Sequence, residues 1–152
     1  MRANGVWISC LLAMAALGTA HAQDKVCKLE ITGNDLLQFD KSELKVAADC
    51  TQVQLTFKNI GQLPVQTMGH SWVLTQTVDM KPVLDAGATA GLAKNYEPEG
   101  DKRIIAATKL IGGGQTTSVT FATRALKKGG DYSYFCSFPG HSAIMKGKLT
   151  FG

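Results

Sequence analysis

The sequence predicts an all-β domain, a sandwich or barrel of about eight strands with one short helix packed outside it. The main observation is alternation with period two: Val53, Leu55 and Phe57 alternate with polar residues, as in a strand that buries one face. Turn signals rich in glycine and asparagine separate the segments of this kind. Strands at this spacing, with no long helices between them, are typical of an antiparallel sandwich or barrel.

Eight segments carry the strand pattern. In chain order they are 27–31, 44–46, 52–58, 71–75, 103–106, 116–121, 132–135 and 147–151. The segment 78–92 breaks the pattern because it is rich in alanine and glycine, and it predicts the short external helix. Pro82 fits the first turn of that helix, where the missing amide hydrogen costs no hydrogen bond.

The first 22 residues have the pattern of an export signal. Arg2 supplies a positive charge, residues 6–17 are almost continuously apolar, and Ala20-His21-Ala22 is a small-x-small cleavage site. The apolar run is short for a bilayer span, so a retained membrane anchor is the less favoured alternative. The sequence therefore predicts a signal peptide, residues 1–22, and one exported domain, residues 23–152.

Without the predicted signal peptide, the chain has a small net charge and few cysteines and histidines. Fifteen basic and twelve acidic residues remain, a formal charge of +3 that is spread along the chain and does not indicate nucleic-acid binding. The remaining cysteines and histidines are Cys27, Cys50, Cys136, His70 and His141.

An odd number of cysteines in an exported protein needs an explanation. An oxidising compartment favours one disulfide, and a Cys27–Cys50 bond would close a loop of about 24 residues, worth about 3 kcal/mol. Cys136 would then be a free thiol, which metal ligation would protect from oxidation. An intermolecular disulfide is the alternative.

One short loop near the C-terminus carries three soft metal ligands. Cys136, His141 and Met145 are separated by four and then three residues, and Pro139-Gly140 bends the chain between them. Thiolate, imidazole and thioether together favour copper, whereas zinc and iron–sulfur sites usually use several cysteines. A trigonal copper centre needs a second histidine, and His70 is the only candidate; a structural histidine is the alternative.

Several motifs along the predicted domain resemble one family. The most specific are Met68-Gly-His-Ser-Trp-Val-Leu74 and Phe135-Cys-Ser-Phe-Pro-Gly-His141. In these motifs the chain is similar to the azurins, bacterial blue copper proteins with the Greek-key cupredoxin fold. The resemblance implies one type 1 copper with His70, Cys136 and His141 as strong ligands. It also implies Met145 and the Gly69 carbonyl as weak axial groups, a Cys27–Cys50 disulfide and a buried Trp72.

The same resemblance implies a periplasmic electron carrier that is not an enzyme and does not insert into membranes. Its partners would be redox proteins, such as c-type cytochromes and copper or haem reductases or dehydrogenases, that dock briefly near His141. The apolar residues expected around that histidine are Leu37, Leu63, Met68, Phe138, Pro139 and Ile144. For Leu63 and Ile144, burial in the core is the alternative.

Two other functions for a copper-binding chain are alternatives to electron transfer. A copper enzyme would need histidines beyond the two present, and a copper delivery protein, the second alternative, typically has methionine clusters or Cys-x-x-Cys.

Ser71 stands where azurins commonly have an asparagine that ties the two ligand loops, which leaves the reduction potential open. Asn59 stands where some azurins have a titrating histidine, so no pH switch is expected there.

Overall fold

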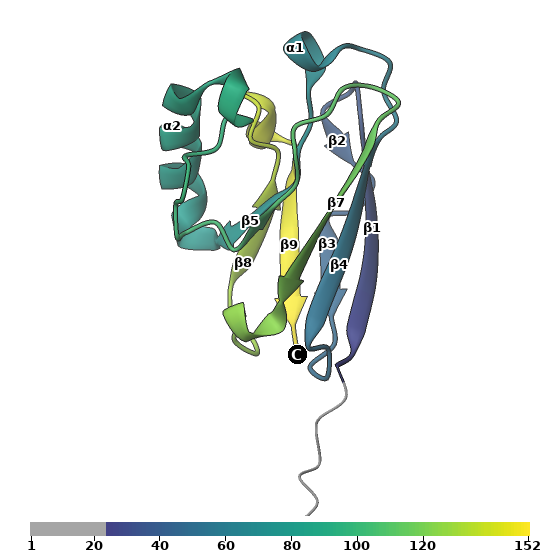
Figure 1. Ribbon diagram of the computed structural model, residues 1–152, viewed down its shortest axis with the longest axis vertical. Coiled ribbons are helices and arrows are strands. Elements are labelled where there is room, and N and C mark those ends of the chain that lie inside the picture. The colour runs from purple at the N-terminus through teal and green to yellow at the C-terminus, as the bar shows by residue number, and fades with distance from the viewer. Residues whose placement is uncertain (1–23) are drawn as a thin grey trace, which may run out of the picture.

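The computed structural model describes residues 24–152, so the predicted signal peptide lies outside the described residues and stays a prediction. Figure 1 shows two β-sheets packed face to face, with helix α2 on the outside. The strands of this part of the chain are β1 (Val26–Asn34), β2 (Gln38–Phe39), β3 (Glu43–Val46), β4 (Gln52–Asn59), β5 (Val73–Gln76), β6 (Ala106–Ala107), β7 (Thr116–Ala122), β8 (Tyr132–Phe135) and β9 (Lys146–Phe151).

The two sheets are mixed, which corrects the prediction of a purely antiparallel arrangement. One sheet has the order β2-β1-β4-β7 and the other β3-β9-β8-β5-β6. The pairs β1–β4 and β3–β9 are parallel, and the other pairs are antiparallel. Between β1 and β4 the chain passes through β3 in the other sheet, so it returns in its original direction instead of turning back in a hairpin. The two sheets stay separate over residues 24–152, so the fold is a sandwich and not a closed barrel.

The core lies between the sheets, where the predicted alternation places it. Val53, Leu55 and Phe57 of β4 are fully buried, while the residues between them are partly exposed. Trp72 is also fully buried, and its ring stacks between Phe121 and Tyr134 with centroid separations of 6.2 and 5.9 Å. Burial of these large apolar side chains is the main favourable term in holding the sheets together.

Two local differences from the predicted strands have physical causes. The two residues of β2 pair with β1 but are too few to show an alternating pattern. The predicted strand 103–106 is reduced to β6, which begins at Ala106. The carboxylate of Asp101 accepts hydrogen bonds from the backbone and the guanidinium of Arg103, and this turn keeps the segment from extending earlier.

The predicted external helix is confirmed. Helix α2 (Met80–Ala90) has Pro82 in its first turn and buries Val83 against Val73 and Phe135 of the second sheet. The shorter helical segments are α1 (Val65–Met68) and the 3-10 turns η1 (Thr77–Asp79), η2 (Leu92–Lys94), η3 (Thr123–Ala125) and η4 (His141–Ala143). No helix within residues 24–152 is long and apolar enough to cross a membrane.

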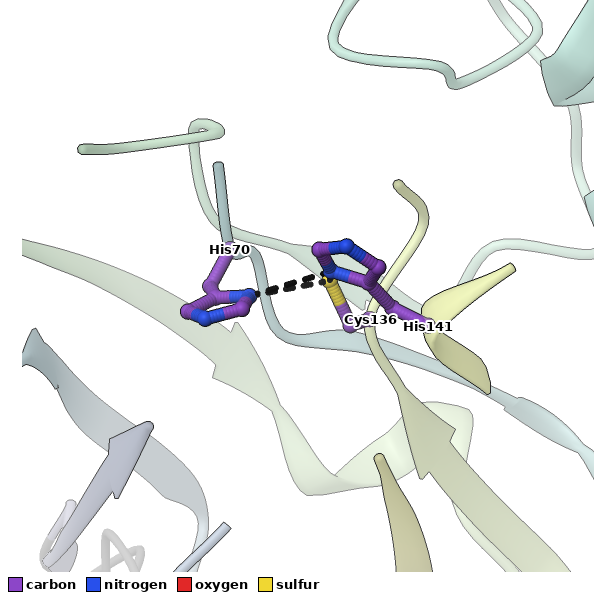
Figure 2. Close-up of side chains that lie close together, drawn as sticks. All are labelled: His70, Cys136 and His141. Carbon is purple, nitrogen blue, oxygen red and sulfur yellow. Dashed lines mark hydrogen bonds between the residues drawn. The ribbon is translucent and has the colours of Figure 1, made fainter. Parts of the chain in front are cut away.

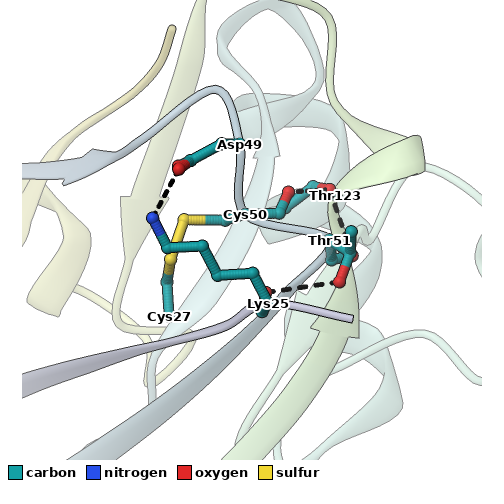
Figure 3. Close-up of a disulfide and its surroundings, with 6 residues drawn as sticks. All are labelled: Lys25, Cys27, Asp49, Cys50, Thr51 and Thr123. Atoms are coloured by element: carbon teal, nitrogen blue, oxygen red, sulfur yellow. Dashed lines mark hydrogen bonds and ion pairs between the residues drawn. A yellow bond between two sulfur atoms is a disulfide. The ribbon is translucent and has the colours of Figure 1, made fainter. Parts of the chain in front are cut away.

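The predicted disulfide is also confirmed, at the end of the sandwich where the described chain begins. Cys27 at the start of β1 is bonded to Cys50 just before β4, with 5.8 Å between their Cα atoms (Figure 3). The Thr123 hydroxyl donates a hydrogen bond of 2.6 Å to the Cys50 carbonyl, which joins β7 to the same corner. Cys136 is the free cysteine among the described residues, and it is buried.

Candidate metal centre

Three side chains from distant parts of the sequence converge at the other end of the sandwich. His70 follows α1, Cys136 follows β8 and His141 begins η4; their ligand atoms all lie within 4.8 Å of one another. Cys136 Sγ lies 3.8 Å from Nδ1 of His70 and 3.7 Å from Nδ1 of His141. Figure 2 shows both Nδ1 atoms turned toward each other and toward the sulfur. All three residues are buried.

Backbone hydrogen bonds fix the two segments that carry these side chains. His70 exchanges two hydrogen bonds of 2.9 Å with Ile111, which anchors the first segment. The loop from Cys136 to Met145 is closed by a bond of 3.1 Å from the Cys136 amide to the Met145 carbonyl. Gly140 has a φ of +83°, a conformation that favours glycine, and this turn brings His141 back toward Cys136.

The hydrogen bonds of His70 determine which of its nitrogens is free. Nε2 lies 2.9 Å from the carbonyl oxygen of Asn34, which can only accept a hydrogen bond. Nε2 therefore carries the proton of the neutral ring, and Nδ1 presents a lone pair. That lone pair faces Nδ1 of His141 at 3.2 Å. Two imidazole nitrogens and a sulfur that face one point are the donor set of a cation site, with Asn34 as an outer support.

Burial sets the charges of the three groups. It raises the pKa of the Cys136 thiol to about 11 and lowers the pKa of His141 to about 4, with the neighbouring His70 adding to the second effect. Burial also lowers the pKa of His70. At neutral pH the imidazoles are therefore neutral and can ligate a metal, while the thiol would exchange its proton for the cation. The residues present fit a soft metal such as copper.

Met145 and Gly69, the expected weaker ligands, adjoin these residues through their backbone atoms. Met145 is fully buried, and its terminal methyl lies so close to Gly33 that a Cβ on Gly33 would be 2.5 Å from it. The Gly69 carbonyl oxygen lies 3.9 Å from Cys136 Sγ. A side chain at position 69 would meet the Val65 carbonyl at 2.6 Å, so glycine is needed for this close approach.

Two serines join the segment that carries His70 to the segment that carries Cys136. The Ser71 hydroxyl accepts a hydrogen bond of 3.1 Å from the Ser137 amide. The Ser137 hydroxyl donates to the Asn95 carbonyl at 2.7 Å, so the hydrogen of the 2.8 Å bond between the serines comes from Ser71. Ser71 therefore reaches the Cys136 segment, which the sequence alone left open. No sequence pattern marks Ser137 or Asn95, because their roles depend on contacts between distant residues.

The apolar residues expected around His141 differ in exposure. Leu63 and Ile144 are 43% and 60% exposed, so the alternative that they belong to the core is wrong. Pro139 is exposed, whereas Leu37, Met68 and Phe138 are half-buried. Leu36, the neighbour of Leu37 in the sequence, is 72% exposed.

The side chain of Asn59, which does not titrate, makes two structural hydrogen bonds. Its side-chain amide donates a hydrogen bond of 3.1 Å to the Ile111 carbonyl, and its side-chain oxygen accepts one of 3.0 Å from the Gly61 amide. Because Ile111 also pairs with His70, Asn59 supports the segment that carries this histidine.

Comparison with known proteins agrees with this geometry. Residues 25–152 match the model of the copper binding proteins of the plastocyanin/azurin family. Azurin-1 of Alcaligenes xylosoxydans xylosoxydans is 51% identical over 123 residues, which cover 81% of this chain and 95% of that protein. Azurin of Bordetella pertussis is 46% identical over 138 residues, covering 91% and 92%.

A solved structure gives the same result for the fold. The azurin Az-iso2 from Methylomonas sp. strain J superposes with a TM-score of 0.80 and 40% sequence identity, over 83% of this chain and 98% of that one. The chain belongs to the plastocyanin/azurin family of copper-binding proteins.

Proposed function

We propose that the protein is a type 1 (blue) copper protein that carries single electrons between redox proteins, with one copper per chain. The observation that carries this proposal is the convergence of one buried thiol and two neutral imidazoles in a member of a copper-binding family. Copper, when bound, supplies a reversible one-electron change between Cu(I) and Cu(II).

His70, Cys136 and His141 would hold the metal, with the Met145 thioether and the Gly69 carbonyl as weaker additional ligands. The rest of the chain keeps these ligands in place. The Asn34 carbonyl orients His70, the Met145 carbonyl holds the Cys136 amide, and the two serines join the ligand segments. Ligands fixed in this way move little when an electron arrives, and their burial excludes water from the metal.

An electron carrier fits the site better than an enzyme or a copper delivery protein. His70 and His141 are the two histidines of residues 24–152, and both belong to the same site, so a second copper centre for bond-making chemistry would lack imidazole ligands. A delivery protein must release its metal readily. Ligands buried beneath two hydrogen-bonded loops favour retention instead.

Docking would take place at the apolar residues expected around His141. Exposed Leu63, Pro139 and Ile144, with half-buried Met68, suit the small and brief interfaces of electron transfer. We propose c-type cytochromes and copper or haem reductases or dehydrogenases as partners. The predicted export signal in residues 1–22 and the disulfide support a periplasmic location.

The first experiment is addition of Cu(II) to the purified copper-free protein. An intense blue colour that ascorbate bleaches and an oxidant restores is expected. A pale or colourless product would contradict the proposal. Because one thiolate and two imidazoles also suit zinc, the copper and zinc contents of the preparation are measured in parallel.

A second experiment tests the docking surface. Met68→Lys should slow electron self-exchange at least about tenfold, because two docked copies would bring like charges together, and it should leave the colour unchanged. The matched control is Val78→Lys, which places the same charge at an exposed position in η1, far from His141. Equal rates in the two variants would contradict docking near His141.

A further inference from the structure

Behind the metal centre lies a turn with an uncommon backbone. Asn95 and Tyr96 have φ values of +56° and +53°, in the left-handed region. Asparagine tolerates this conformation, but for a bulky residue such as tyrosine it is rare and strained. Strain of this kind persists only where the surrounding structure imposes it.

Helix α2 imposes the turn from one side. Gly87 of α2 packs so tightly that a Cβ there would lie 2.1 Å from the Tyr96 carbonyl oxygen. The Tyr96 amide donates a hydrogen bond of 2.9 Å to the carbonyl of Gly91, just after the helix. The turn is thus clamped to the end of the helix.

The other side of the turn contacts the two residues that follow Cys136. The Asn95 carbonyl accepts the hydrogen bond from the Ser137 hydroxyl, and its side-chain oxygen accepts one of 3.2 Å from the Leu110 amide. The Tyr96 and Phe138 rings meet in a T-shaped contact, with 5.2 Å between centroids. Phe138 in turn stacks on His141 at 4.4 Å and an interplanar angle of 25°.

We propose that the Asn95-Tyr96 turn, backed by helix α2, is a positioning element that holds Phe138 against the His141 imidazole. Tyr96 is not one of the proposed ligands, and it acts through Phe138. What His141 does once it is positioned rests on the proposed function, whereas the contacts of the turn do not. Helix α2 would then support this turn as well as cover the sheet.

The test uses the copper-free protein and two substitutions of one residue. Tyr96→Leu removes the aromatic ring that contacts Phe138, whereas Tyr96→Phe keeps it. The amides of His141 and Met145, both hydrogen-bonded within the loop, should exchange with solvent at least about tenfold faster in Tyr96→Leu and within about twofold of the original rate in Tyr96→Phe. After copper loading, Tyr96→Leu alone should shift the blue absorption band and the reduction potential.

Leu126→Ala provides the control for a general loss of stability, because this buried residue lies just after η3, at the opposite end of the sandwich. If it accelerates the same two amides equally, or if Tyr96→Leu leaves them unchanged, the proposal is overturned. The unsubstituted copper-free protein gives an independent result by NMR. Slow flipping of the Phe138 ring with contacts to Tyr96 and His141 is expected; fast flipping without them would overturn the proposal even if Tyr96→Leu does not fold.

These results are separable from those on the proposed function. A protein that stays colourless with Cu(II) would contradict the blue copper assignment. The amide exchange rates of the copper-free protein would still decide whether Tyr96 holds the loop.

Discussion

The two ends of the sandwich both contain buried or half-buried cysteine sulfur, and they use it differently. At the end where the described chain begins, Cys27 and Cys50 form a disulfide beside the exposed Lys25–Asp49 ion pair (Figure 3). At the other end, Cys136 is unpaired and faces two imidazoles (Figure 2). The neighbours of each sulfur, and not the cysteine itself, decide between a covalent link and a metal ligand.

The hydrogen bonds also differ between the two ends of the sandwich. Near the disulfide, strands are joined by the Thr123 hydroxyl and by an ion pair in water, which contributes little to stability. Near Cys136, the side-chain hydrogen bonds of Ser71 and Ser137 are buried, where a lost partner costs more. Substitutions at the first end should therefore change stability, and those at the second should also change the metal site.

The largest expected effect is at Cys136. Cys136→Ser should remove essentially all of the intense visible absorption of the copper-loaded protein, because the thiolate ligand is lost, and should keep the fold. Visible absorption and circular dichroism measure the two properties. A variant that remains as blue as the original protein would remove Cys136 from the site.

Removal of the disulfide should give the reverse result. The double substitution Cys27→Ala and Cys50→Ala should lower the free energy of unfolding by about 3 kcal/mol, because the unfolded chain regains the freedom of a long loop. Urea titration measures this loss. The blue colour should persist, and its loss under native conditions would show that the two ends are not independent.

A third prediction concerns Glu97, which follows the Asn95-Tyr96 turn. Burial raises the pKa of this carboxyl from 4.5 to about 7, and its Oε1 has no hydrogen-bond partner among residues 24–152. Between these pH values the folded state holds a proton that the unfolded state has released, so stability falls as pH rises from about 4.5 to 7.

Glu97→Gln should remove this dependence and stabilise the protein at pH 8 by on the order of 1–3 kcal/mol, with little difference at pH 4. Denaturant titrations at several pH values measure it. Glu99→Gln is the matched control: Lys94 lowers the pKa of this exposed carboxyl through a side-chain hydrogen bond, so any change should be small and of opposite sign. Identical pH profiles for Glu97→Gln and the original protein would contradict the prediction.

The smallest expected effect on stability is at Ser71. Ser71→Ala leaves the buried Ser137 amide without its partner and should cost about 1–2 kcal/mol, with a measurable shift of the reduction potential. Voltammetry and urea titration give the two values. Ser118→Ala, at an exposed position of β7, should change neither. A potential that stays the same in Ser71→Ala would show that the serine tie has no effect on the metal.

The sequence was sufficient for the features that depend on local patterns. The alternation in β4, a short helix within 78–92 and the pairing of Cys27 with Cys50 were predicted and are confirmed. The parallel pairs were not predicted, because strand direction depends on how the chain crosses between sheets.

The candidate site shows the same limit. His70, Cys136 and His141 could be predicted because copper chemistry requires those residue types, and the structure brings them together. The contacts of Ser137, Asn95 and Tyr96 could not, because serine, asparagine and tyrosine occur throughout proteins in other roles. Their importance follows only from which distant residues they touch.

The disulfide end of the sandwich is also where both ends of the described chain emerge, as Figure 1 shows, with Gly152 exposed beside the last strand. A tether or fused domain joined at Gly152 would therefore leave on the side opposite His141. Attached to an electrode or a surface through this point, the protein would present the end that carries His141 outward. Immobilisation at Gly152 should thus leave accessible the proposed docking surface that labelling of random surface lysines would obstruct.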